Sequence, residues 1–343
     1  MTHRFPIKEI ALQAGLSTAT VDRVINDRPN VSAQTRARVA AALQELETQE
    51  AQLAAKGRRL FFDVVVEAPD RFAREIRAAT DRILPLMGGA VIRPRFEMHE
   101  VLEERRTLAI LDRIARRGSH GICLKVRDVP LVRQAISDLM ARGIPVVTIF
   151  TDIPASARIA YAGLDNHSAG RTAAWLMAQT LGRGAQGAIL TTLSNRQFAG
   201  ETARFEGFRA EMAQLLPRLR LVDAWDGGGL NLTTGQAVAG KLAVERDILA
   251  VYSMGGGNRA VLAELDRFGI KPQVYIAHDL DQDNLALLRA ERLTFVIDHD
   301  LEADMRAAFA HLLAYRGLVP PNSTGGGSDI HVVTPMNIPE HRG

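Results

Sequence analysis

Residues 7–27 read IKEIALQAGLSTATVDRVIND, and this stretch decides how the first part of the chain folds. Its first apolar residues recur at helical spacing, and the predicted helix ends at Gly15, since glycine adopts a positive φ at little cost. Ser17 is a favourable N-cap residue for a second helix. The residues predicted to be buried on the two helices are Ile7, Ile10, Ala11, Ala14, Val21, Val24 and Ile25.

A third helix completes this predicted unit. Residues 26–30 form a loop by composition, with Pro29 inside it. Ser32 can then cap a helix whose apolar residues are Val39, Leu43 and Leu46. Two helices joined by a tight glycine-containing turn, together with a third that closes a small core, constitute a helix-turn-helix domain.

The composition of the chain is that of a soluble globular protein. Its 343 residues are enough for two or three domains at about 150 residues each, and 47% of them are hydrophobic. The single cysteine, Cys123, allows no internal disulfide and fits a reducing compartment. Neither an export signal nor an apolar run of the ~20 residues needed for a membrane span is present in the sequence. We therefore expect a cytoplasmic protein without a membrane partner.

The positive charge is concentrated near the N-terminus. Residues 1–59 hold nine Lys or Arg and six Asp or Glu, whereas the rest of the chain holds 33 of each. The whole excess of +3 therefore lies in the first sixth of the chain, which holds the predicted helix-turn-helix domain and linker. This distribution indicates a nucleic-acid-binding module attached to a neutral body, although a solvated basic face is the alternative.

The pattern A-x-x-A-G-x-S-x-x-T-V-x-R-V-x-N, followed by V-S-x-x-T-R, lies within residues 7–46 and resembles the N-terminus of the LacI/GalR family of transcription regulators. The resemblance implies a homodimer that binds double-stranded operator DNA, with residues 17–25 as the recognition helix in the major groove. It implies phosphate contacts for Ser32 and Thr35, which would set the register of binding. The other residues that it assigns to the DNA are Ser17, Thr18, Ala19, Thr20, Asp22, Arg23 and Asn26.

Asp22 is unusual in a helix that faces DNA, and family members often carry serine there. Helical spacing places it on the same outer face as Thr18 and Ala19. An acid in this place can accept a hydrogen bond from a cytosine amino group or fix the pose of a nearby base, the candidates being Lys8, Arg23 and Arg28. A tolerated acid at the helix edge is the alternative.

The linker departs from the family pattern, which usually reads L-x-Y-x-P-N-x-x-A-x-x-L and inserts a leucine into the minor groove. Here the Tyr, Pro and Asn are absent, and Gly57 stands in the place of the inserted leucine. Leu53 or Leu60 could replace it, but Glu, Gln and Ala in this segment equally favour an extension of the third helix.

From residue 62 onward, eight β-rich runs alternate with amphipathic segments. This alternation predicts an α/β fold of doubly wound parallel sheets. The runs are FDVVVE (62–67), VIRPRFEM (91–98), GICLKV (121–126), IPVVTIF (144–150), GAILTTL (187–193), DILAVYS (247–253), QVYIAH (273–278) and LTFVID (293–298).

This part of the chain resembles the periplasmic sugar-binding proteins, which form the usual core of the same regulators. The resemblance implies two lobes joined by three crossovers, the first of them at the GLDN stretch of residues 163–166. The predicted organisation is a helix-turn-helix domain at 1–47, a linker at 48–60 and an effector domain at 61–343, with lobe 1 at 61–163 and 293–323 and lobe 2 at 164–292 and 324–340.

Ligands of such sheets bind at the carboxyl ends of the strands. The resemblance implies a small-molecule effector, namely a sugar, a polyol or a sugar acid, in the cleft between the lobes. Phe72 would stack on a sugar ring, Arg204 of the R-x-x-G-F pattern would face the ligand, and His299 stands where many relatives have glutamine. The full expected set is Phe72, Asp152, Arg204, Asn258, Asp279 and His299, each with a surface or structural role as its alternative.

The sequence offers little support for a cofactor site, a metal site or an enzyme active site. GRGAQG at 182–187 follows a predicted helix rather than a strand, so it is no dinucleotide fingerprint. Asp279, Asp281 and Asp283 have the spacing of a calcium loop but lack its glycine and its final glutamate. We therefore expect no metal, no cofactor and no catalysis. The predicted function is a ligand-responsive repressor, and the alternatives are a sugar-binding protein or a sugar-modifying enzyme without DNA regulation.

Overall fold

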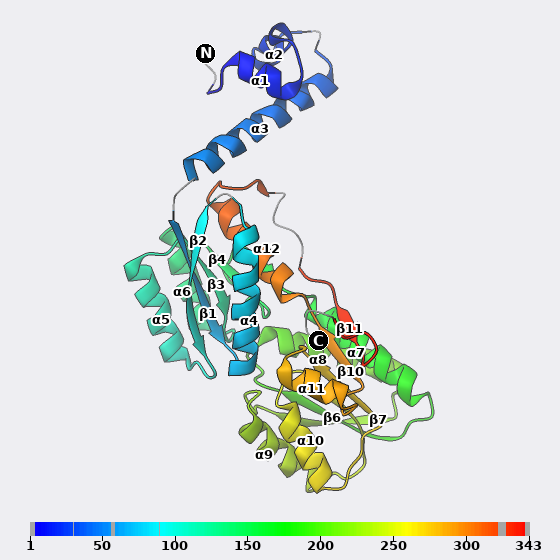
Figure 1. Ribbon diagram of the computed structural model, residues 1–343. Helices are drawn as coiled ribbons and strands as arrows, with labels where there is room; N and C mark the ends of the chain where they lie inside the picture. Colours follow the sequence, from blue (N-terminus) through cyan, green and yellow to red (C-terminus); the bar gives the residue numbers. More distant parts are fainter. Residues whose placement is uncertain (1–3, 30, 56–58, 89, 322–326, 340–343) are drawn as a thin grey trace.

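A computed structural model describes residues 4–29, 31–55, 59–88, 90–321 and 327–339 of the chain. A small head of three helices at the N-terminus leads into a two-lobed α/β core (Figure 1). This architecture confirms the fold class that the sequence predicts.

The head folds as its sequence pattern indicates. Helix α1 (Ile7–Ala14) ends at Gly15, whose φ of 61° is left-handed. Helix α2 (Thr18–Ile25) begins at Ser17, whose side chain accepts a hydrogen bond from the Thr20 amide at 3.1 Å. Both helices pack on α3 (Ala33–Ala55) around a common core. The buried apolar residues of this core are Phe5, Ile10, Ala11, Ala14, Val21, Val39, Ala42 and Leu46.

Helix α3 corrects the predicted boundary between the head and the linker. It continues without a break from Ala33 to Ala55, so the boundary at residues 47 and 48 falls inside a helix. The next strand begins at Arg59, within the predicted linker. Leu60 is buried in the core of the first lobe and is therefore unavailable as a minor-groove wedge. Gly57 and the side chain of Leu53 lie outside the described residues.

The first lobe is built on a five-stranded parallel sheet in the order β2-β1-β3-β4-β5. The apolar runs of β1, β3 and β4 are largely buried on both faces, as in a parallel sheet covered by helices, whereas the edge strand β2 is mostly only partly buried. Its elements are β1 (Arg59–Glu67), α4 (Asp70–Ile83), the 3₁₀ helix η1 (Leu84–Leu86), β2 (Val91–His99), α5 (Glu104–Arg117), β3 (Gly121–Lys125), α6 (Pro130–Ala141), β4 (Val146–Ile149) and β5 (Ala160–Ala162).

The second lobe is built on a six-stranded sheet in the order β11-β10-β9-β8-β6-β7, in which only β11 is antiparallel to its neighbour. Its elements are α7 (Asn166–Leu181), β6 (Gly187–Leu193), α8 (Ala199–Leu215), β7 (Leu219–Trp225), α9 (Asn231–Leu242), β8 (Ile248–Ser253), α10 (Asn258–Arg267), β9 (Val274–His278), α11 (Gln282–Arg289), β10 (Phe295–Asp298) and β11 (His331–Val333).

The second crossover lies later in the chain than predicted. Strand β10 pairs with β9 and therefore belongs to the second lobe, so the predicted start of the returning segment at residue 293 is wrong. The chain returns after His299, and helix α12 (Leu301–Tyr315) packs into the core of the first lobe. An apolar strand sequence fits either sheet equally well, which is why LTFVID alone could not show its partner.

Candidate functional site

The outer face of the head carries the residues that the sequence assigns to DNA. Thr18, Ala19, Arg23 and Asn26 are exposed on or beside α2, whereas Val21 on the opposite side is fully buried. At the start of α3, the Ser32 hydroxyl accepts a hydrogen bond from the Thr35 amide at 3.1 Å. The hydroxyl groups of Ser32 and Thr35 therefore both lie at the N-terminus of this helix. A helix N-terminus of this kind favours contact with a phosphate.

Asp22 is held by neighbouring residues rather than left free. Its carboxylate accepts a hydrogen bond from the Asn26 side chain at 2.8 Å and forms an ion pair with Arg28 at 3.3 Å. Of the three bases that the sequence offered as partners, the structure therefore selects Arg28. Arg28 lies in the turn after α2, so the contact is compatible with a positioning role for Asp22, which stays a prediction.

We expect Asp22→Ser to tighten binding to random duplex DNA and to relax base preference at one operator position. The variant removes a negative charge that would repel DNA phosphates, and it releases Arg28 from its ion pair, so binding to any duplex should tighten. It also removes a hydrogen-bond acceptor worth roughly 1–3 kcal/mol of base discrimination, so the preference for one base should weaken. Titrations of operator and random duplex at two salt concentrations measure both effects.

Asp22→Asn serves as the matched control, because the amide keeps an acceptor but loses the charge. We expect it to tighten random-duplex binding as well. If both variants weaken that binding, or if neither alters the operator preference, Asp22 is a tolerated helix-edge acid.

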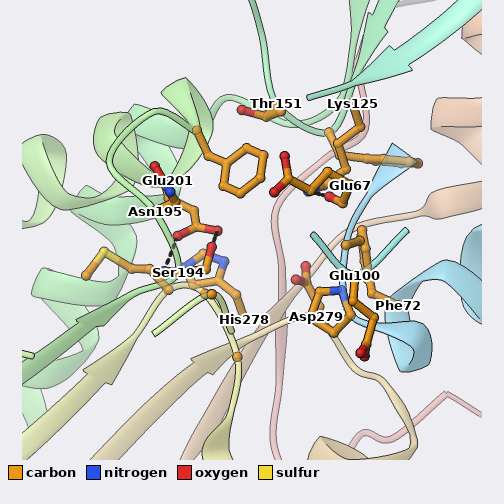
Figure 2. A pocket seen from close by; sticks show the side chains of 18 of the residues that line it. Glu67, Phe72, Glu100, Lys125, Thr151, Ser194, Asn195, Glu201, His278 and Asp279 are labelled. Carbon is orange, nitrogen blue, oxygen red and sulfur yellow. Dashed lines mark hydrogen bonds between the residues drawn. The ribbon is translucent and has the colours of Figure 1, made fainter. Parts of the chain in front are cut away.

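A cavity lies between the two lobes at the points where each sheet reverses its strand order. In the first lobe these are the ends of β1 and β3, which supply Glu67 and Lys125; in the second they are the ends of β6 and β8, which supply Ser194 and Met254. Ligands of doubly wound sheets bind at such points. Figure 2 shows side chains from both lobes converging on this space.

The cavity lining contains buried polar atoms that form no hydrogen bond with another protein group, although two of them, Asp279 Oδ1 and His299 Nε2, lie 3.4 Å apart as an ion pair. Within the described residues, seven buried side-chain atoms lack a hydrogen-bond partner, and four of them belong to residues of this lining. Since a buried polar group without a partner costs about 1–3 kcal/mol, such a concentration indicates a place for ligand groups that donate and accept hydrogen bonds. The four atoms are Glu67 Oε2, His278 Nδ1, Asp279 Oδ1 and His299 Nε2.

Aromatic rings line the same cavity. The rings of Phe72 and Phe150 meet edge to face, with their centroids 5.6 Å apart, and Phe198 approaches from the second lobe. The Lys125 ammonium lies 4.4 Å from the centroid of the Phe198 ring. Apolar ring faces beside hydrogen-bonding groups form the kind of lining that orients a small polar molecule.

Arg204 reaches the cavity because α7 and α8 pack backbone to backbone. A Cβ atom on Gly170 would lie 1.9 Å from the Arg204 carbonyl oxygen, and one on Gly207 would lie 2.2 Å from that of His167. The glycine of the R-x-x-G-F pattern therefore permits this close approach. The buried guanidinium then donates hydrogen bonds to Asn166 Oδ1 at 2.7 Å and to the Met254 carbonyl at 3.1 Å.

His299 lies between two carboxylates at the crossover. Its Nδ1 is 2.6 Å from Asp304 of α12, and its Nε2 is 3.4 Å from Asp279. Burial lowers the pKa of His299, but the two acids outweigh burial and raise this pKa to about 10. Burial likewise opposes the charge on Asp279, yet His299 and Arg204 hold the pKa of that carboxyl below its usual range. At neutral pH the cavity wall therefore contains an imidazolium between two carboxylates.

Two of the six expected ligand residues do not line this cavity. The Asp152 carboxylate is occupied by the Arg158 guanidinium at 2.5 Å, by the Thr148 hydroxyl and by the Ile153 amide. Asn258 is buried behind the lining, where it exchanges hydrogen bonds with Asn284 and the Tyr275 hydroxyl. Both side chains stabilise loops that shape the cavity, whereas Phe72, Arg204, Asp279 and His299 line it.

The sequence analysis missed several residues of the lining. Glu67 pairs with Arg127 at 2.5 Å, and Lys125 donates a hydrogen bond to the Glu67 carbonyl at 2.8 Å. Glu201 accepts hydrogen bonds from the amide and hydroxyl groups of Ser194. Burial lowers the pKa of Lys125 and raises the pKa of Glu201. The signal available in the sequence was that Glu67 ends one predicted strand and Lys125 is the next-to-last residue of another.

Two further properties concern the described parts of the chain alone. No helix there combines the length and the hydropathy needed to cross a lipid bilayer. Among the same residues, no group of three or more His, Cys, Asp and Glu side chains is arranged to hold a metal ion, the Asp298-His299-Asp300 stretch included.

The fold and the cavity define a two-lobed binding protein with a helix-turn-helix head. Residues 103–317 match the periplasmic binding protein domain family, and residues 6–48 match the bacterial regulatory proteins of the lacI family. The chain therefore belongs to the periplasmic binding protein domain family, and its N-terminal segment makes it a lacI-type regulatory protein.

One curated relative is a repressor. The sucrose operon repressor of Pediococcus pentosaceus is 26% identical to this chain over 220 residues, which cover 62% of this chain and 63% of the repressor. The match thus spans less than two thirds of the repressor's length.

Solved structures show the same core fold. GanP, a glucose-galactose binding protein from Geobacillus stearothermophilus, is 19% identical, with a TM-score of 0.72 over 82% of this chain and 99% of that one. A solute-binding protein of an ABC transporter from Burkholderia graminis, solved with D-arabinose, is 20% identical, with a TM-score of 0.70 over 82% of this chain and 97% of that one. At these identities the likeness concerns the fold. The family matches are to regulatory and binding proteins.

Proposed function

We propose that this protein is a repressor that binds operator DNA through α2 and is controlled by a small polyhydroxylated effector bound between its lobes. The effector is a sugar, a polyol or a sugar acid. Binding changes the closure of the lobes and thereby the placement of the head on the DNA. The protein acts in the cytoplasm as a homodimer on a pseudo-palindromic site, and it catalyses no reaction.

The observation that carries this proposal is the set of four buried polar atoms in the cavity that form no hydrogen bond with the protein, two of which, Asp279 Oδ1 and His299 Nε2, face each other as an ion pair at 3.4 Å. Glu67 Oε2 and Asp279 Oδ1 are acceptors, which hydroxyl groups of a ligand can satisfy by donation. His278 Nδ1 and His299 Nε2 add two ring nitrogens to the same lining. Two separate acceptor or donor atoms, Glu67 Oε2 and His278 Nδ1, together with this ion pair and the aromatic rings suit a molecule with several hydroxyl groups better than an apolar one.

A thermal-shift screen of sugars, polyols and sugar acids tests the effector half of the proposal. A ligand present at one hundred times its Kd stabilises the folded protein by about 2.7 kcal/mol, which raises the melting temperature measurably. Hits are then added to gel shifts with operator DNA. A screen without hits would contradict the ligand assignment, and a hit that leaves operator binding unchanged would contradict the coupling.

The two rival functions make different predictions. A sugar-binding protein without DNA regulation would bind ligand but show no preference for any duplex sequence. A sugar-modifying enzyme would consume the ligand, which chromatography of an incubated mixture detects. Light scattering coupled to size exclusion gives the oligomeric state, and a monomer at micromolar concentration would contradict the dimer.

We also expect the protein to bend its operator less sharply than relatives that insert a leucine. A kink is stabilised by an apolar side chain wedged between base steps. Here α3 runs unbroken to Ala55, Leu60 is buried in the core, and glycine occupies position 57. Circularly permuted gel shifts measure the bend. A sharp central kink that disappears in Leu53→Ala would show that the linker does insert.

A further inference from the structure

One arginine of the first lobe reaches into the second. Arg71, in the first turn of α4, forms an ion pair with Asp281 at 2.8 Å and donates a hydrogen bond to the Gly229 carbonyl at 2.8 Å. The side chains of Arg71 and Asp281 are only 14% and 6% exposed. These contacts therefore join the lobes across the cavity that both residues line.

The second lobe is shaped to receive this side chain. Two triple-glycine turns, residues 227–229 after β7 and 255–257 after β8, form what we call the glycine socket. A Cβ atom on Gly256 would lie 2.2 Å from the Arg71 guanidinium, so a side chain there would displace it. One on Gly229 would lie 2.2 Å from the Gly255 carbonyl, so the two turns pack as closely as glycine permits.

The loop that holds Arg71 also faces the ligand position. Asp279 and Asp281 lie in the segment between β9 and α11, and Asp279 has a left-handed φ of 66°. Asp279 Oδ1 lines the cavity without a hydrogen bond and faces His299 at 3.4 Å, whereas Asp281 caps α11 through the Asn284 amide and holds Arg71 through its other oxygen. A ligand bound to Asp279 and the ion pair between Asp281 and Arg71 therefore both act on the short segment between β9 and α11.

We infer that Arg71 is a positioning residue that holds the two lobes closed over the cavity and so couples effector binding to lobe closure. The ion pair with Asp281 supplies the attraction, and the glycine socket admits the guanidinium only when the lobes meet. The coupling rests on the proposed function, because it requires a ligand in the cavity. The closing contact itself does not, so it can be tested without a ligand.

The test measures the distance between spin labels on the two lobes. Leu131 of α6 and Leu232 of α9 are exposed, and the native Cys123 is buried, so Leu131→Cys and Leu232→Cys can be labelled selectively. In Arg71→Ala we expect the distance distribution to broaden and lengthen by several ångströms without ligand. Arg71→Lys keeps the charge, but an ammonium group cannot contact Asp281 and the Gly229 carbonyl with the geometry of the guanidinium. We therefore expect an increase in the distance between the labels that is intermediate between wild type and Arg71→Ala.

Two further variants make the result specific. Asp281→Asn keeps an oxygen to cap α11 but loses the charge, so it should lengthen the distance as Arg71→Ala does, and the double variant should add little. Arg82→Ala is the matched control, since Arg82 lies on the same helix and pairs with Glu302 within the first lobe. We expect it to leave the distance unchanged.

The outcomes separate the two proposals. An unchanged distance in both Arg71→Ala and Asp281→Asn, or an equal change in Arg82→Ala, would overturn the closing role of Arg71. With a ligand from the screen, Arg71→Ala should speed dissociation by roughly thirtyfold or more, the low end for a buried charge pair, and an unchanged rate would overturn the coupling. A screen without hits would contradict the proposed function while the distance measurement still stands.

Discussion

Arg204→Ala is expected to weaken binding of the effector by roughly 2–5 kcal/mol, the range found when one member of a buried charged contact is truncated. The guanidinium lines the cavity and is 6% exposed, so no water replaces it easily. Operator binding should persist, because the DNA-facing residues lie on the separate head. Calorimetry with the cognate ligand and gel shifts without it measure the two properties.

Arg204→Ala also removes two internal hydrogen bonds. A control variant must therefore separate a loss of ligand binding from a loss of folding stability. Asn166 and the Met254 carbonyl would lose their donor, which costs about 1–3 kcal/mol for each buried acceptor left alone. Arg209→Ala provides the comparison, because Arg209 lies on the same helix but is exposed and pairs only with Glu206. If Arg204→Ala remains folded and binds the ligand with wild-type affinity, Arg204 has no part in recognition.

His299→Gln is expected to lower the free energy of unfolding at pH 6 by about 3–5 kcal/mol, because it leaves the buried Asp304 carboxylate and the partly buried Asp279 carboxylate without their cation. The wild-type protein should also lose stability as the pH rises. The folded pKa of about 10 lies above the usual 6.5, so the contribution of His299 is complete below pH 6.5 and disappears as the pH passes through 10.

Urea unfolding between pH 6 and pH 10 measures this effect. The slope of stability against pH should flatten in His299→Gln. His311→Gln is the control: His311 lies on α12, the helix that carries Asp304, and burial lowers its pKa from the usual 6.5, so it does not share the loss of stability expected for His299 toward pH 10. An unchanged slope in His299→Gln would show that the imidazole is not charged between Asp279 and Asp304.

The residues of local motifs were the ones that the sequence could place. Ser17 and Gly15 mark helix ends through their own backbone and side-chain chemistry, and the structure has both in those roles. The eight apolar runs correspond to strands because a strand buried on both faces must be apolar throughout. Strands β5, β7 and β11 were missed, since two of them have only three residues and β7 carries polar residues at the edge of its sheet.

Positions defined by a loop were less predictable. Asp152 follows a strand, as Phe72 and Asp279 do, yet it turns toward Arg158 and away from the cavity. Distance from a strand end does not fix where a side chain points, because the loop conformation decides it. Phe150, two residues earlier, has a left-handed φ of 61° and lines the cavity instead.

The sequence by itself determined the three helices of the head, the α/β character of the core and the identity of Arg204 as a candidate, because each depends on residues within about one element of each other. Tertiary structure alone decided the rest. It placed β10 in the second sheet and paired Asp22 with Arg28. It also brought Arg71 into an ion pair with Asp281, more than half of the chain away in sequence. The first and last of these contacts arise from the order of strands in two sheets, which no local spacing encodes, whereas the Asp22 contact arises from the turn that follows α2.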